Sequence, residues 1–171
     1  MSYKLKLPFI NTFIFDVDGV LTDGGVNILT NEAVRTLNSR DGYALQYAAK
    51  MGYTIFIISG GNSKAVKDRL LSAGIKEVVL QASNKVKVYE ELKAKYNFKD
   101  ETTLYMGDDI PDYNVMSMVG VAACPQDAAV EIKEIADYQS PFKGGHHCVR
   151  DVIEQTLRVQ DKWFKAEAHE W

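Results

Sequence analysis

The amino-acid sequence predicts an α/β fold, a three-layer sandwich in which helices cover both faces of a parallel sheet of five or more strands. Short apolar runs alternate along the chain with longer amphipathic segments, as expected of strands joined by crossover helices. The short runs are hydrophobic throughout, which is typical of strands buried on both faces. No repeat and no Pro/Ser-rich linker divides the chain, so we expect a single domain over residues 1–171.

The strands are predicted from short runs rich in β-branched and aromatic residues. They cover residues 12–15, 54–58, 78–80, 103–106 and 121–123. One segment interrupts the alternation, because residues 26–29 and 33–37 flank a polar turn at 30–32 and resemble a β-hairpin. We expect this hairpin to form a small flap over about residues 24–38. No insertion is long enough for a separate cap domain.

Four amphipathic segments are predicted helices. They cover residues 42–51, 63–73, 85–96 and 149–159. Asp41, Asn62 and Asn84 precede the first three and are of the residue types that cap a helix N-terminus. Gly52 and Gly74 follow the first two, where a helix commonly ends in left-handed backbone.

Composition argues against several classes of function. The chain is 46% hydrophobic and 25% charged, with a formal net charge of −3, so we expect neither a nucleic acid nor a membrane surface as partner. The longest apolar runs have the length of strands and fall short of a membrane span. Two cysteines, Cys124 and Cys148, are too few for a disulfide framework. We therefore expect a cytoplasmic protein.

Polar residues follow four of the predicted strands, at the edge of the sheet where open α/β folds bind ligands. They are Asp16 and Asp18 after the first strand, Ser59, Gly60 and Gly61 after the second, Lys85 after the third, and Asp108, Asp109 and Asp112 after the fourth. Carboxylates gathered there would repel one another unless a cation lay between them. Oxygen ligands alone favour Mg²⁺ over zinc.

The other residues at this edge suit a phosphoryl group. The hydroxyl of Ser59 and the ammonium of Lys85 can contact phosphoryl oxygens, and Gly60 and Gly61 let backbone N–H groups approach an anion. Together with a magnesium site they predict a phosphoryl-transfer centre, in which positioning and electrostatics supply most of the catalysis.

The same residues resemble the four motifs of the haloacid dehalogenase superfamily of phosphatases. Asp16-Val17-Asp18-Gly19-Val20-Leu21-Thr22 is similar to the first motif, Ser59 and Lys85 match the second and third, and Gly107-Asp108-Asp109-Ile110-Pro111-Asp112 matches the fourth. The match runs in order from about residue 13 to 150. It implies a Rossmann-like scaffold and a Mg²⁺-dependent phosphomonoesterase.

The resemblance also implies a role for each residue. Asp16 would be the nucleophile that forms an aspartyl-phosphate, and Asp18 the acid that protonates the leaving oxygen and later activates water. Ser59 and Lys85 would hold the transferring phosphoryl group. The implied Mg²⁺ ligands are Asp16, the backbone carbonyl of Asp18, and Asp108. Asp109 and Asp112 would orient the waters of the metal or Lys85.

Within the superfamily, the chain is most similar to the capless 3-deoxy-D-manno-octulosonate 8-phosphate phosphatase family, which acts in lipopolysaccharide precursor synthesis. The short hairpin and the segments 40–43, 83–85 and 144–150 carry this similarity. It implies a homotetramer in which the flap of a neighbour closes each active site. It also implies that Arg40 and Arg150 bind the substrate.

Several alternatives remain at the level of sequence. Relatives that act on nine-carbon sugar acid 9-phosphates tend to carry Glu where this chain has Gly61, which favours the eight-carbon substrate. The octulosonate enzymes often carry Arg there, so Gly61 is not decisive. His146-His147-Cys148 departs from the family pattern, and adjacent residues are poorly placed to share one zinc ion. The non-enzymatic alternatives are a phosphoacceptor, disfavoured because Lys85 precedes the Gly107-Asp108-Asp109 segment, and an oligomerisation module.

Overall fold

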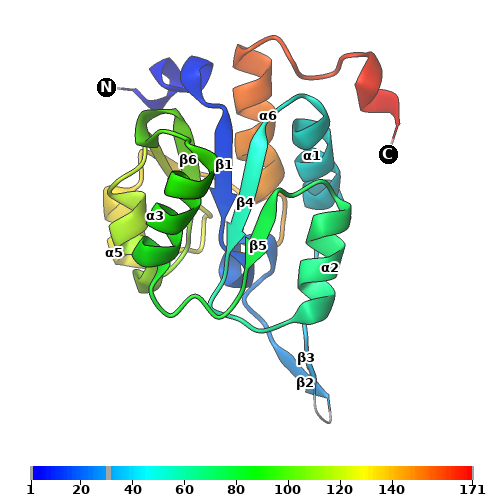
Figure 1. Cartoon of the computed structure of the whole chain (residues 1–171), viewed down its shortest axis with the longest axis vertical. Helices are drawn as coiled ribbons and strands as arrows, with labels where there is room; N and C mark the ends of the chain where they lie inside the picture. The colour runs from blue at the N-terminus through cyan, green and yellow to red at the C-terminus, as the bar shows by residue number, and fades with distance from the viewer. Residues whose placement is uncertain (1, 30–31, 171) are drawn as a thin grey trace.

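The computed structural model describes residues 2–29 and 32–170, and its centre is a parallel sheet (Figure 1). Among these residues the sheet has six strands in the order β5-β4-β1-β6-β7-β8, each paired in parallel with its neighbours. They are β1 (Thr12–Phe15), β4 (Thr54–Ile58), β5 (Glu77–Val79), β6 (Thr103–Met106), β7 (Val121–Cys124) and β8 (Tyr138–Gln139). The predicted fold class is confirmed, and β8 is an addition to the five expected strands.

The register of the three central strands brings their carboxyl ends level. Phe15 of β1 lies beside Ile57 of β4 on one side and Met106 of β6 on the other. The residues that follow these strands therefore meet at one edge of the sheet, as the sequence predicts.

Helices cover both faces of the sheet (Figure 1). One face carries α1 (Ser39–Lys50), α2 (Lys64–Ser72) and α6 (Cys148–Val159), and the other carries α3 (Lys85–Tyr96), α4 (Tyr113–Met116) and α5 (Val130–Ile135). Alternate residues of β1 serve the two layers, because Phe13 and Phe15 pack under the first group and Ile14 under the second. All three side chains are fully buried, and each contributes about 1.5–3 kcal/mol of hydrophobic stabilisation.

The predicted flap is present as an antiparallel pair, β2 (Asn27–Leu29) and β3 (Glu32–Val34). It projects beyond the carboxyl ends of the strands, while the N- and C-terminal segments lie at the opposite end of the molecule (Figure 1). Its apolar side chains are exposed, and Ile28 is 79% accessible. Residues 30 and 31 of the predicted turn lie outside the described residues.

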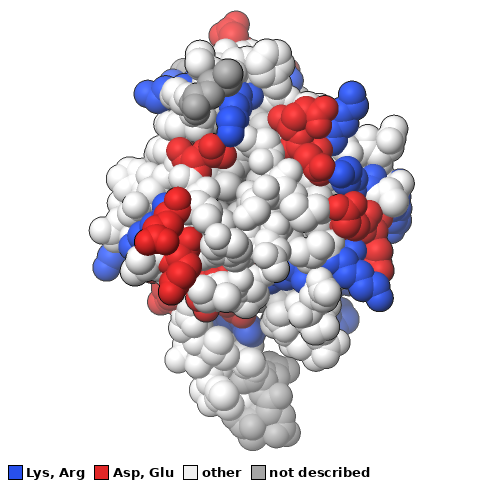
Figure 2. Space-filling view, turned by 90° about the vertical axis from the view of Figure 1, so that its left-hand side faces the viewer, with Lys and Arg blue, Asp and Glu red and all other residues white. Residues whose placement is uncertain are grey.

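Figure 2 shows acidic and basic side chains interspersed over one face of the molecule, with a flap whose described surface is largely uncharged. None of the described helices combines the length and the apolar character needed to cross a membrane.

Two predicted helix caps are wrong. Helix α1 begins at Ser39, and Asn38 caps it by accepting bonds from the amides of Arg40 and Asp41. Helix α2 begins at Lys64 with Ser63 as its cap, in place of Asn62. In both cases the polar residue one to three positions away has the better reach to the free amides of the first turn, whereas Asn84 caps α3 as predicted.

Asp41 has a different task, which joins two helices. It is 1% exposed, and its carboxylate accepts hydrogen bonds from the amides of His147 (3.2 Å) and Arg150 (2.8 Å) at the start of α6. A carboxylate at a helix N-terminus accepts hydrogen bonds from free amides and interacts favourably with the helix dipole. Asp41 therefore fixes α6 to α1 across the chain.

Replacing Asp41 with Ala should lower the free energy of unfolding by roughly 3 kcal/mol, because two buried amides lose their acceptor. Urea denaturation of the variant measures this loss. Asp68→Ala, at an exposed position of α2, is the matched control and should shift stability by less than about 0.5 kcal/mol. An Asp41→Ala protein as stable as the parent would show that the bridge contributes nothing.

Candidate active site

The residues that follow β1, β4 and β6, together with the start of α3, line one cavity of about 510 Å³. Of the predicted catalytic and metal-binding residues, all lie along its wall: Asp16, Asp18, Lys85, Asp108, Asp109 and Asp112. Gly60 and Gly61 line it as well. The structure thus brings together side chains that are up to about a hundred positions apart in the chain.

Lys85 lies at the centre of this group. Its Nζ is 2.9 Å from Asp16 Oδ2 and 2.7 Å from Asp112 Oδ1, and its side chain is 5% exposed. Burial lowers the pKa of Lys85, but the charges of Asp16 and Asp112 outweigh burial and raise it above its usual value. Lys85 is therefore a fixed positive charge between two carboxylates.

Each of these carboxylates is held by a second donor. Asp16 Oδ1 accepts from the amide of Val17 at 2.6 Å, and Asp112 Oδ1 accepts from the hydroxyl of Tyr105. Asp112 Oδ2 accepts from the amide of Asp108 at 3.3 Å. Asp112 therefore has its oxygens engaged by the protein and orients Lys85, whereas Asp16 keeps lone pairs free towards the cavity.

Asp108 is the carboxylate without a counterpart. Its Oδ1 is buried and has no hydrogen-bond partner among the described residues. Burial, and then the charges of Asp16 and Asp112, raise the pKa of Asp108 to about 7. Burial and the charge of Asp112 likewise raise the pKa of Asp16 to about 6, against the lowering effect of Lys85. The positive charge of Lys85 therefore does not offset burial and the neighbouring carboxylates at either residue.

This arrangement fits a hard divalent cation. Oxygen atoms of Asp16, Asp108 and Asp112 lie within 4.8 Å of one another, and the set contains no nitrogen or sulfur ligand. The unpartnered Asp108 Oδ1 is an observation that a cation would explain. Two of the three carboxylates, Asp16 and Asp108, are those that the sequence predicts as ligands.

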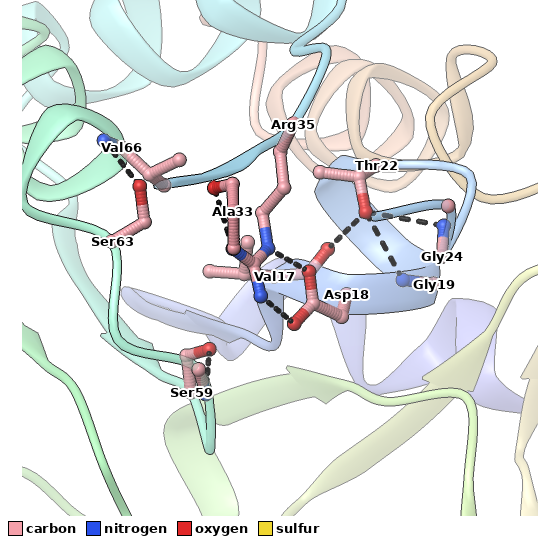
Figure 3. A network of polar contacts seen from close by, with 12 residues as sticks. Val17, Asp18, Gly19, Thr22, Gly24, Ala33, Arg35, Ser59, Ser63 and Val66 are labelled. Atoms are coloured by element: carbon pink, nitrogen blue, oxygen red, sulfur yellow. Dashed lines mark hydrogen bonds and ion pairs between the residues drawn. The ribbon is translucent and has the colours of Figure 1, made fainter. Parts of the chain in front are cut away.

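Gly19 allows Asp108 to approach the loop after β1. Its φ is +86°, and a Cβ there would lie 2.0 Å from Asp108 Oδ2. The hydroxyl of Thr22 shapes the same loop by accepting from the amides of Gly19 and Gly24 and donating to the carbonyl of Val17 (Figure 3). The glycine and the threonine of the first motif are therefore required by local geometry.

Asp18 has a partner that the sequence did not reveal. Its carboxylate forms a two-point ion pair with Arg35, Nε to Oδ1 at 2.5 Å and Nη2 to Oδ2 at 3.0 Å (Figure 3). Arg35 follows β3, so the pair links the flap to the loop after β1. The available signal was that Arg35 is the one positively charged residue in the sequence of the flap, residues 24–38.

Ser59 is buried beside the cavity, and its Oγ accepts from the amide of Gly61 at 3.1 Å. Around Gly60 a Cβ would meet nothing within 4 Å, so the backbone there is open. Asp109 is exposed, and its Oδ1 accepts from the amide of Ile110 at 2.8 Å, which begins the turn leading to α4. Ser59 and Gly60 thus follow β4, and Asp109 follows β6, while their predicted roles stay predictions.

Arg40 and Arg150 are not brought to this cavity. They line a separate one of about 460 Å³, which includes Arg158. Arg150 Nε is 3.2 Å from Glu154 Oε2, and its guanidinium lies over the ring of Trp163. Their predicted contact with substrate stays a prediction.

The remaining unusual segment has structural contacts. The Nδ1 atom of His146 is 2.8 Å from the carbonyl of Gly144, and the buried Cys148 thiol donates to the carbonyl of Val20. The amide of His147 is bound to Asp41, as described above. This segment thus attaches the start of α6 to the loop after β1.

Comparison with known proteins gives the following similarities. The family described as haloacid dehalogenase-like hydrolase matches residues 70–153. The 3-deoxy-D-manno-octulosonate 8-phosphate phosphatase KdsC of Escherichia coli K12 is 35% identical over 162 residues, which cover 94% of this chain and 86% of that protein. The enzyme of the same name from Yersinia pestis is 34% identical over 90% of this chain and 82% of its own length.

Solved structures agree with the sequence matches. The crystal structure of the Yersinia pestis phosphatase has a TM-score of 0.91 at 33% identity, covering 94% of this chain and 88% of that one. The Moraxella catarrhalis phosphatase, solved in complex with magnesium ion, phosphate ion and a KDO molecule, has a TM-score of 0.90 at 26% identity, covering 94% and 93%.

The raised pKa values predict a pH dependence of the metal-free protein. The folded state keeps protons on Asp108 and Asp16 that the unfolded state releases near pH 4. In excess EDTA, the free energy of unfolding should therefore fall as the pH rises from about 4 to about 7. Asp108→Asn should flatten this slope in urea titrations, and an unchanged slope would contradict the assignment.

The same carboxylate predicts a stabilisation by metal. Mg²⁺ at about a hundred times its dissociation constant should stabilise the parent by about 2.7 kcal/mol, seen as a higher Tm at pH 7.5. Asp108→Asn should lose this shift. Asp68→Asn, outside the cavity, should keep it, and an equal shift in both variants would place the metal elsewhere.

Proposed function

The chain belongs to the capless 3-deoxy-D-manno-octulosonate 8-phosphate phosphatase family of the haloacid dehalogenase superfamily, and we propose that it hydrolyses this phosphomonoester to the free sugar acid and phosphate. The observation that carries the proposal is Lys85, buried between Asp16 and Asp112 beside the unpartnered Asp108. An anionic ester needs such a fixed cation among so many carboxylates. The product would enter lipopolysaccharide precursor synthesis.

In the proposed mechanism Asp16 is the nucleophile. Val17 and Lys85 hold its two oxygens, so the carboxylate is oriented before substrate arrives. Attack on phosphorus forms the aspartyl-phosphate and breaks the bond to the leaving oxygen, which takes a proton from Asp18. Asp18 then accepts a proton from the water that cleaves the aspartyl-phosphate, and Asp16 is restored.

The phosphoryl oxygens are held by the groups around Asp16. Lys85 and the hydroxyl of Ser59 contact them, and the open backbone at Gly60 presents its amide to the same anion. The amide of Gly61 is bonded to Ser59 Oγ and so orients this hydroxyl. We assign Mg²⁺ to Asp16, Asp108 and the carbonyl of Asp18, in keeping with the magnesium in the Moraxella catarrhalis structure. When bound, Mg²⁺ supplies positive charge that offsets both the carboxylates and the phosphoryl oxygens.

The assembly is also proposed. A homotetramer in which the flap of one copy closes the site of another would cover the exposed apolar side chains of the flap, Ile28 among them. Arg40 and Arg150 line a different cavity of their own chain, so any contact with substrate would come from a neighbouring copy. We propose further that residues 1–171 form one domain and that the protein acts in the cytoplasm.

Asp16→Asn should reduce the turnover of 3-deoxy-D-manno-octulosonate 8-phosphate by about 10⁴-fold or more, because the nucleophile is lost. Phosphate release in the presence of Mg²⁺ measures this, and Asp68→Asn is the control that should retain parental activity. A nine-carbon sugar acid 9-phosphate, assayed in parallel, tests the alternative substrate. An Asp16→Asn enzyme that releases phosphate as fast as the parent would contradict the proposed mechanism.

Ile28→Ser combined with Leu29→Ser should convert the tetramer into smaller species, because both exposed side chains would lose an apolar partner. Sedimentation velocity gives the mass, and kcat/KM should fall with it if a neighbour closes the site. A variant that stays tetrameric would show that these side chains lie outside the interface.

A further inference from the structure

Arg35 extends from the flap to the edge of the active-site cavity, where it pairs with Asp18. Its side chain is 8% exposed although the strands that carry it are accessible. Asp18 takes its Nε and Nη2, and its Nη1 donates to the carbonyl of Ala33 at 3.2 Å. A guanidinium has five N–H groups. These three bonds therefore orient Arg35 and leave donors for another ligand.

The guanidinium of Arg35 lies close to Gly61, which has no side chain to keep it away. A Cβ on Gly61 would be 3.0 Å from Arg35 Nη2, 3.2 Å from Asp18 Oδ2 and 3.3 Å from Ser59 Oγ. A cationic donor, a carboxylate and a hydroxyl thus converge on this glycine, and Figure 3 shows the two bonds between Arg35 and Asp18. A side chain at position 61 would displace the guanidinium.

We propose that Arg35 is a substrate-binding residue that contacts the hydroxyl group on the carbon next to the esterified carbon of a polyhydroxylated phosphate ester. The inference rests on the proposed function, in which Asp18 stands within hydrogen-bond distance of the leaving oxygen. Arg35 grips both oxygens of Asp18, so an oxygen one carbon away from the leaving oxygen lies within its reach.

With this contact, different residues bind the phosphoryl group and the alcohol part of the substrate. Lys85 and Ser59 hold the phosphoryl group, which every phosphate ester has, whereas Arg35 faces the alcohol that distinguishes one ester from another. The substrate hydroxyl replaces part of the bond between Arg35 and Asp18, and Asp18 turns to the leaving oxygen. Esters that lack the neighbouring hydroxyl gain nothing from Arg35.

The test compares two substrates in Arg35 variants. Arg35→Met should lower kcat/KM for 3-deoxy-D-manno-octulosonate 8-phosphate by on the order of 10- to 100-fold, the effect of a lost charge-assisted bond. The loss for 4-nitrophenyl phosphate should be at least about tenfold smaller. Arg35→Lys keeps the charge without the planar fork and should recover the preference only in part.

Lys64→Met is the matched control, because it removes a positive charge beside the flap at an exposed position. It should keep the parental ratio between the two substrates. Equal losses for both substrates in Arg35→Met would overturn the proposal, since Arg35 would then serve the phosphoryl group or the fold.

A binding measurement separates this inference from the proposed function. In the Asp16→Asn background with Mg²⁺, calorimetry should show that Arg35→Met weakens binding of the octulosonate phosphate by a similar factor. If the parent hydrolyses neither substrate while binding weakens, the proposed function fails and Arg35 remains a ligand-binding residue. The contrary outcome is that the parent hydrolyses the octulosonate phosphate while Arg35→Met changes neither the substrate ratio nor binding. In that case Arg35 does not contact the substrate, and the inference is overturned.

Discussion

A single buried ammonium group, that of Lys85, is set against three buried or half-buried carboxylates. Two unit charges 4 Å apart interact by about 4 kcal/mol at the effective dielectric of a protein. The excess negative charge is therefore costly in the chain alone, and it appears as the raised pKa values of Asp16 and Asp108. A divalent cation and the proposed substrate would bring the charges of this site into balance.

The scaffold contributes mainly by letting these carboxylates and Lys85 approach one another without steric clashes. Parallel register ends three strands at one level, and the segments that follow these strands then meet around one cavity. Gly19 and Gly107 carry no side chain where Asp108 and Asp112 must pass, since a Cβ on Gly107 would lie 2.4 Å from the Cβ of Asp112. The aspartates and the glycines of these motifs are thus two parts of one steric requirement.

Much of this could be predicted from sequence, because strong patterns have short-range causes. The strands follow from apolar runs, and the order of Asp16, Ser59, Lys85 and Asp108 follows from the ends of those strands. The short elements α4, α5 and β8 carry too few residues for a periodic signal. The sequence assigned Asp41 to the wrong helix and missed Arg35, because each acts on a distant segment: Asp41 caps α6, and Arg35 binds Asp18 from the flap.

Both termini lie at the end of the molecule opposite the flap and the cavity (Figure 1). A tether to a solid support, or a fused reporter protein, could therefore be attached at either extremity without covering the mouth through which esters enter. This arrangement makes oriented immobilisation possible by simple genetic fusion.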